Sequence, residues 1–242
     1  MKKLLVTLFI LSASSSIFSQ SWWNSKKVRG NGNITTIERS VGDFDEVSVG
    51  GSFDVVLVDG REGKITIEGE ENIIPYIVTE VRGDKLKINV KKNTNIRFTR
   101  KLTVTIPFED ISSLSLGGSG NITSKKVINS SNVSLAIGGS GNIKAKVKAS
   151  NVSTSIGGSG NIRVAGTTES MKCSIAGSGN VKGYNLTTQT LKVNVAGSGD
   201  IEATVKEKIK ATVVGSGSVY YKGNPKYIDT NSLGSGDVVK RD

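Results

Sequence analysis

Few side chains of this 242-residue chain could catalyse a reaction or ligate a metal ion. The sequence contains no histidine, the most frequent general base and a common metal ligand in enzymes. Its single cysteine, Cys173, has no activating partner beside it in the sequence. One cysteine also excludes an intramolecular disulfide, so we expect Cys173 to serve as a small apolar residue of the core.

The acidic residues leave one catalytic possibility, a pair of carboxylates of the kind that hydrolyses glycosidic bonds. Asp200 and Glu202 are two positions apart in an alternating stretch, so both would face the same side of a strand. Asp237 occupies the position equivalent to Asp200 two repeats later, about 9–10 Å away at the usual strand spacing, the upper limit for inverting glycosidases. An aromatic platform for a sugar ring is missing from the neighbouring sequence. We expect a non-catalytic protein, with a polysaccharide-active β-helix enzyme as the alternative.

A Gly-Ser-Gly tripeptide occurs seven times between residues 118 and 236, at intervals of 21, 19, 19, 20, 18 and 19 residues. Each copy is followed by a small polar residue and then by Ile or Val. The small polar residues are Asn121, Asn142, Asn161, Asn180, Asp200, Ser218 and Asp237. A fixed period near twenty is typical of a solenoid, in which each unit buries its apolar face against its neighbours.

The apolar residues before each tripeptide alternate with polar ones, as in Val133, Leu135 and Ile137, which predicts strands and not helices. Each unit is therefore a strand, a glycine corner, a second strand and a looser return, stacked as a parallel β-helix. Glycine suits the corner because it tolerates positive φ and close approach of the adjacent coil. The polar residues after the corners would stack as a structural ladder of side-chain amides.

We expect no cofactor and no metal ion at this ladder. Hard cations such as calcium need several carboxylate or carbonyl oxygens that converge on one point. The ladder has Asn at four positions and Asp at only two, so most of its members are neutral amides.

Positive charge is concentrated in the repeats. Residues 111–242 hold 16 Lys and Arg against 7 Asp and Glu, a net charge of +9, whereas residues 4–110 hold 14 of each. We predict a binding surface formed by Lys144, Lys146, Lys148, Lys206, Lys208 and Lys210. Such a surface would attract an anionic glycan, an envelope component or a protein partner, although solvated lysines also protect a long sheet from aggregation. Nucleic acid is not expected, because this part of the chain has no Phe or Trp for stacking on bases.

The part before the repeats differs from them in composition and in the length of its strands. Residues 1–20 combine Lys2 and Lys3 with a short apolar run and a Ser-rich end, which predicts a signal peptide and an exported protein. A flexible segment is expected at residues 21–33. Residues 34–110 contain longer strands and more aromatic residues, so we expect an irregular β region that caps the solenoid of residues 111–242.

The Gly-Gly-Ser-Gly-Asn-Ile repeats, together with the upstream stretch of residues 44–55 and the Glu71-Asn72-Ile73-Ile74 segment, resemble a known family. It is the auto-transporter adhesin head GIN domain family of bacterial envelope proteins. The resemblance covers nearly the whole chain after residue 20 and implies a right-handed, single-stranded parallel β-helix. The family has no agreed functional residues to transfer, and no alternating strands of a translocator barrel follow the repeats.

These observations predict a non-catalytic protein of the periplasm, the cell surface or the medium of a Gram-negative-type bacterium. It would act as an adhesin or binding module that presents a basic β-helix surface. A purely structural spacer of the envelope, without a ligand, is a further alternative. The oligomeric state is left open.

Overall fold

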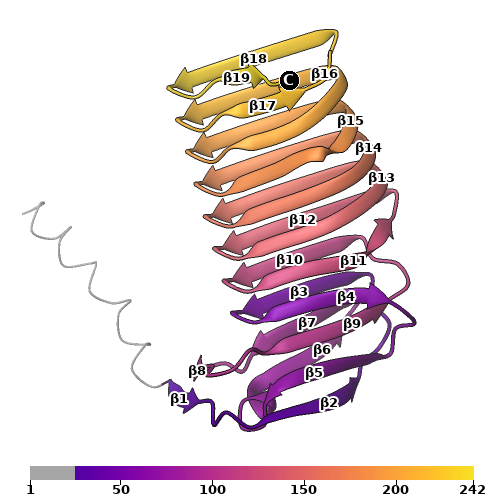
Figure 1. Cartoon of the computed structure of the whole chain (residues 1–242), viewed down its shortest axis with the longest axis vertical. Helices are drawn as coiled ribbons and strands as arrows, with labels where there is room; N and C mark the ends of the chain where they lie inside the picture. The colour runs from indigo at the N-terminus through magenta and orange to yellow at the C-terminus, as the bar shows by residue number, and fades with distance from the viewer. Residues whose placement is uncertain (1–24) are drawn as a thin grey trace, which may run out of the picture.

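A computed structural model describes residues 25–242, and this part of the chain is built almost entirely of β-strands (Figure 1). Strands of successive repeats pair side by side in parallel, so that about seven turns, about 19 residues apart, form one column. The prediction of an all-β parallel β-helix with irregular N-terminal strands is confirmed. The predicted signal peptide at residues 1–20 lies outside the described residues.

Each coil contributes one strand before its Gly-Ser-Gly corner and one after it, and these strands build two faces of the column. We call the strands before the corners the upstream face: β7 (Lys85–Val90), β3 (Glu46–Gly51), β10 (Ser113–Gly118), β12 (Asn132–Gly139), the second halves of β13 (Asn142–Gly158), β14 (Asn161–Gly177), β15 (Asn180–Gly197) and β16 (Ile201–Gly215), and β18 (Tyr227–Gly234). The downstream face consists of β9 (Thr103–Phe108), β4 (Asp54–Asp59), β11 (Asn121–Asn129), the first halves of β13 to β16, β17 (Val219–Lys222) and β19 (Val238–Lys240).

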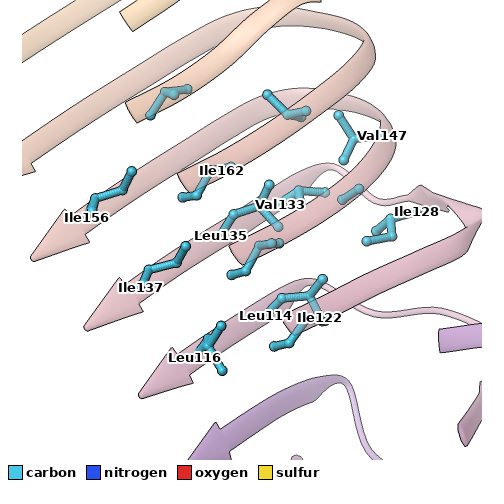
Figure 2. Close-up of a cluster of buried hydrophobic side chains, with 14 of the residues drawn as sticks. Leu114, Leu116, Ile122, Ile128, Val133, Leu135, Ile137, Val147, Ile156 and Ile162 are labelled. Carbon is cyan, nitrogen blue, oxygen red and sulfur yellow. The ribbon is translucent and has the colours of Figure 1, made fainter. Parts of the chain in front are cut away.

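The core lies between the two faces. In β12, Val133, Leu135 and Ile137 are buried, whereas Asn132 and Ser134 on either side of Val133 are exposed. Figure 2 shows the same arrangement over several coils, with aliphatic side chains from both faces pointing into the column. Burial of each such side chain contributes about 1.5–3 kcal/mol, so the stacked rows supply most of the stability. Cys173 is fully buried in one of these rows, as expected.

The corners are held together by a repeated contact between backbones. The N–H groups of Ser140 and Gly141 both donate to the carbonyl oxygen of Gly118 in the coil below, each at 3.0 Å. The next corner repeats this, since Ser159 and Gly160 donate to Gly139, also at 3.0 Å. A Cβ on the last glycine of a corner would collide with the carbonyl below it, so only glycine fits.

The base of the column does not follow chain order. β3 and β4 pair on one side with β7 and β9 and on the other side with β10 and β11. The chain therefore forms the second coil of the column first, with β3 and β4. It then forms the lowest coil, with β7 and β9, and continues above the second coil with β10 and β11. β3 and β4 belong to the column although they lie before residue 111, where we expected the repeats to begin.

Antiparallel strands close the base. β5 (Lys64–Glu70) pairs antiparallel with both β9 and β2 (Ile34–Ser40), and β6 (Ile77–Arg82) pairs antiparallel with β7. A short 3₁₀ helix, η2 (Ile74–Tyr76), connects β5 to β6. β1 (Lys26–Arg29) and β8 (Thr94–Arg97) form a separate two-stranded sheet beside the base.

Glu70 joins that small sheet to the base. Its carboxylate is only 1% exposed and accepts hydrogen bonds from the backbone N–H groups of Gly32, Thr99 and Arg100 and from the Thr99 hydroxyl. Burial alone would raise its pKa, but these four donors outweigh burial and lower the pKa to about 2.

We predict that Gly160→Ala lowers the free energy of unfolding by about 2 kcal/mol or more. The added methyl group would lie 2.8 Å from Cγ2 of Ile137 and against the carbonyl oxygen of Gly141. Ser159→Ala, at the exposed middle position of the same corner, serves as the control and should change stability little. Urea denaturation of both variants measures the difference, and equal stabilities would contradict the close-contact explanation.

We predict that Glu70→Gln destabilises the base by about 1–3 kcal/mol at pH 7, because an amide nitrogen would replace one acceptor oxygen that faces N–H donors. The wild-type pKa is depressed below its ordinary value of 4.5, so the contribution of Glu70 is present above pH 4.5 and is lost as the pH falls towards 2. Thermal melting between pH 2.5 and 7 should therefore show wild type and variant converging at the acidic end. A constant difference over this range would refute the assignment.

Candidate functional site

The polar residues after the corners form a continuous row of hydrogen bonds on the downstream face. The side-chain amide nitrogen of Asn142 donates to Asn121 Oδ1 at 2.9 Å, and Asn161 donates in the same way to Asn142 at 3.1 Å. Asn180 continues the row by donating to Asn161 at 3.0 Å. The amide planes are thereby fixed along the column axis, one per coil.

The two ends of this ladder differ from its middle. At the lower end Asn121 donates to Asp54 Oδ1 at 2.7 Å, so the ladder extends one coil below the first Gly-Ser-Gly copy. At the upper end, side-chain oxygens accept from the backbone: Asp200 N–H donates to Asn180 Oδ1 at 2.9 Å and Ser218 N–H to Asp200 Oδ1 at 2.8 Å. Asp237 N–H ends the row with a long bond of 3.4 Å to the Ser218 hydroxyl.

A row of cations lies directly beside the ladder, two residues further along each coil. Lys144 is in register with Arg163, and Arg163 with Lys182, so the three exposed side chains stand on adjacent rungs. Neighbouring rungs are about 4.8 Å apart. The same row continues upward through Glu202 and Tyr220. We call Lys144, Arg163, Lys182, Glu202 and Tyr220 the downstream stripe.

Two tyrosines lie at the upper end of this stripe. The ring of Tyr220 has the Arg241 guanidinium 4.7 Å from its centroid, and the ring of Tyr184 has Lys222 Nζ at 5.4 Å. Burial, and then the charge of Glu202, raise the pKa of Tyr184. Aromatic side chains therefore lie beside Glu202, contrary to the expectation from the sequence. Tyr220 is its register partner on the next rung, and Tyr184 is near enough for the charge of Glu202 to raise its pKa.

A shallow groove of about 300 Å³ separates the ladder from the lower part of the stripe. Its walls combine the amides of Asn121, Asn142 and Asn161 with the cationic side chains of Lys144, Arg163 and Lys182. It is open and runs across coils, with apolar surface between its polar side chains. Such a shape fits an extended polar ligand better than a compact one.

The structure does not bring the six predicted lysines together. Lys144, Lys146 and Lys148 lie on the downstream face, but Lys210 lies on the upstream face, in register with Lys192 and Asp229. Lys206 and Lys208 lie around the bend between the two halves of β16. Alternation places all six lysines on the outside of the column, but it does not show on which of the two faces each one lies. We therefore grouped lysines that are two to three coils apart into one surface.

The upstream face has a cationic row of its own, formed by Lys172, Lys192 and Lys210 on adjacent rungs. Lys210 Nζ lies 2.8 Å from Asp229 Oδ2, and this contact raises the pKa of Lys210 and lowers that of Asp229. The upper end of this row is thus neutralised, unlike the three cations of the downstream stripe.

Both rows have a signal in the sequence that we missed. Lys144, Arg163 and Lys182 each follow the ladder residue of their coil by two positions. Lys172, Lys192 and Lys210 each precede the first glycine of their corner by five positions. Counting every charge from the nearest corner, instead of along the strand, would have separated the two rows.

The acids of the proposed catalytic pair have structural contacts. Asp200 Oδ1 accepts the ladder bond from Ser218, and Asp237 Oδ1 accepts from the backbone N–H of Val238 at 2.7 Å. Burial raises the pKa of the Cys173 thiol to about 12, which keeps it protonated. Within residues 25–242 no three His, Cys, Asp or Glu side chains are grouped so that they could hold a metal ion.

We predict that Asn142→Ala lowers the free energy of unfolding by about 1–2 kcal/mol, because it removes the bonds to both neighbours in the ladder. Lys146→Ala, at an exposed position on the same strand, is the control. Urea denaturation compares the two variants. If they are equally stable, the ladder contributes nothing to the stability of the column.

Comparisons with known proteins agree with this architecture. The structure resembles the crystal structure of a "putative adhesin" from Bacteroides fragilis with a TM-score of 0.84 and 22% identity, over 88% of this chain and 100% of that one. It also resembles a "putative lipid binding protein" from Parabacteroides distasonis, with a TM-score of 0.76 and 29% identity, over 90% of this chain and 100% of that one. No curated protein matches the chain. In the described part of the chain, no helix is both long and apolar enough to cross a membrane. The family model "Putative auto-transporter adhesin, head GIN domain" matches residues 43–225, and the chain belongs to this family.

Proposed function

We propose that this protein is a non-catalytic, exported adhesive module that binds anionic polysaccharide along the downstream stripe. One observation carries the proposal: three cations, Lys144, Arg163 and Lys182, stand on successive rungs beside a fixed row of amides. A linear polyanion laid along the column would meet one cation per coil. Export rests on the apolar run after Lys2 and Lys3.

The chemistry of the stripe suits acidic sugars. The Arg163 guanidinium presents a planar fork that can bind a carboxylate or sulfate through two hydrogen bonds, and the lysines add charge above and below it. The amides of the ladder, of which Asn142 is exposed and the others are half-buried, can donate to or accept from hydroxyl groups. Tyr184 and Tyr220 at the upper end offer half-buried rings, which have an apolar body and a polar tip.

A lipid ligand is favoured less by these contacts. The relative from Parabacteroides distasonis is described as a lipid binding protein, and a phosphate headgroup shares the anionic chemistry. An acyl chain, however, needs an apolar cavity, and the space between the two faces is filled by packed aliphatic side chains (Figure 2). The groove beside the stripe is open to solvent, with amides and cations on its walls.

A pair of matched double variants tests the proposal. Arg163→Glu/Lys182→Glu reverses two charges of the downstream stripe, and Lys172→Glu/Lys192→Glu reverses two charges of the upstream face. Both change the net charge by the same amount. We predict that the first raises the Kd for a sulfated or carboxylated polysaccharide about tenfold or more, while the second changes it less than about threefold.

Binding is measured by isothermal titration at low and moderate salt, with neutral dextran and vesicles of anionic phospholipid as the other two probes. Equal losses in both variants would show that only net charge matters and would contradict a stripe. Preferential binding to vesicles would replace the glycan by a membrane. A shortened polysaccharide after incubation would restore the enzyme alternative, and no binding to any probe would leave the structural spacer.

A further inference from the structure

The C-terminal end of the column exposes a complete strand. All eight residues of β18 are exposed, including three large apolar side chains. Tyr227 is 68% exposed, Ile228 49% and Leu233 62%. Among residues 25–242, β18 pairs with β16 on one edge, and its other edge continues no ladder.

The interior of this last coil is also open. Ile228 and Thr230 are in register with Ile209 and Ala211, which are buried, so their side chains point into the column. They are exposed because no coil lies above them in the described chain. At the base the antiparallel strands β2, β5 and β6 extend the two faces, and two large apolar side chains, Ile34 and Val78, are exposed there.

Apolar surface on the upstream face increases towards this end. One outward row runs through Gly157, Ala176, Ala196, Val214 and Leu233 on successive rungs. Val214, next to the last rung, is 46% exposed. The side chains of this row become larger from glycine to leucine, so the largest apolar ones lie at the open end. Exposed apolar side chains that are grouped in this way are typical of an interface.

We propose that a second copy of this chain docks on this end, with the two β18 strands pairing antiparallel about a two-fold axis through Thr230. Outward residues then meet outward residues: Tyr227 lies opposite Leu233 of the second copy, and Asp229 lies opposite Asn231. Inward residues also meet, with Ile228 opposite Ser232 and Thr230 opposite itself. Every pair occurs twice except the central one, as an isologous contact requires.

Charge selects this register. Moving the axis to Asp229 would place two carboxylates opposite each other, and moving it to Asn231 would place Asp229 opposite Leu233. Only the register centred on Thr230 combines an apolar pair with a polar one.

The order of residues along β18 selects a second copy over an unrelated strand. The column ends in two strand edges, β18 on the upstream face and β19 on the downstream face. A two-fold axis normal to the upstream face pairs β18 with β18 of the second copy, so that the upstream sheet continues from one column into the other.

The cationic residues of the C-terminus lie on or just after β19 and not on β18. Lys240 is on β19 and donates to Asn224 at 2.7 Å, and Arg241 packs on the Tyr220 ring. β18 itself carries only Asp229, which is paired with Lys210. Its edge therefore lacks the lysines that usually block pairing between sheet edges.

Sedimentation equilibrium of the full chain, over a range of concentrations, tests the proposal with two opposite variants at one position. Asn231→Asp places like charges opposite each other twice per dimer and should raise the dimer Kd about tenfold, whereas Asn231→Lys creates two attractive pairs with Asp229 and should lower it. A wild-type protein that stays monomeric at all concentrations would overturn the proposal. A dimer that responds equally to both variants would also overturn it.

Crosslinking locates the axis independently. Thr230→Cys brings two thiols opposite each other at the Cα separation of about 4.5–5.5 Å found in antiparallel pairs, within disulfide range. We expect an oxidised dimer on a non-reducing gel, and no dimer from Ser159→Cys, an exposed control on a corner. The buried Cys173 does not compete. A Thr230→Cys protein that oxidises no faster than the control would contradict the two-fold register.

Discussion

The close contact between backbones at the Gly-Ser-Gly corners determines the rest of this structure. One carbonyl oxygen accepts two N–H groups from the corner above, and neither glycine of the pair could carry a side chain there. The contact repeats at every corner, although the carbonyls of Gly177 and Gly215 accept only one of the two N–H groups, so successive coils stack without drifting sideways. Residues at equal distances from their corners therefore form straight rows, whether they are aliphatic, amide or cationic.

Because these rows are straight, residues that lie at the same distance from the corner in consecutive coils form a continuous surface along the column. A cation two residues after the ladder position recurs in three consecutive coils and becomes a line of charge, although nothing in a single coil is unusual. The amide ladder stiffens the strand ends beside this line through bonds of 2.9–3.1 Å. The ladder and the line of charge lie two residues apart in each coil. A change in the repeat at these positions therefore affects both the surface and the stacking of the coils.

The repeat period and the alternation were sufficient to predict the parallel β-helix, the stacking of the corners and the interior position of Cys173. The base was less predictable, because the pairing of β3 and β4 with both β7–β9 and β10–β11 depends on contacts between distant segments that share no motif. The lysine rows were assigned to one surface because alternation specifies inward or outward but not which face. Tyr220 was missed near Glu202 because positions were not counted from the corners: Tyr220 follows Ser218 by two positions, as Glu202 follows Asp200.

The interleaved base also has a consequence for the order of folding. Ladder contacts in the column join residues 19 apart in the chain, whereas the bond between Asn121 and Asp54 joins residues 67 apart. The longer loop costs about 1 kcal/mol more chain entropy to close. The repeats can consequently nucleate among themselves and propagate coil by coil, while the base is completed late by segments that must return from the opposite direction.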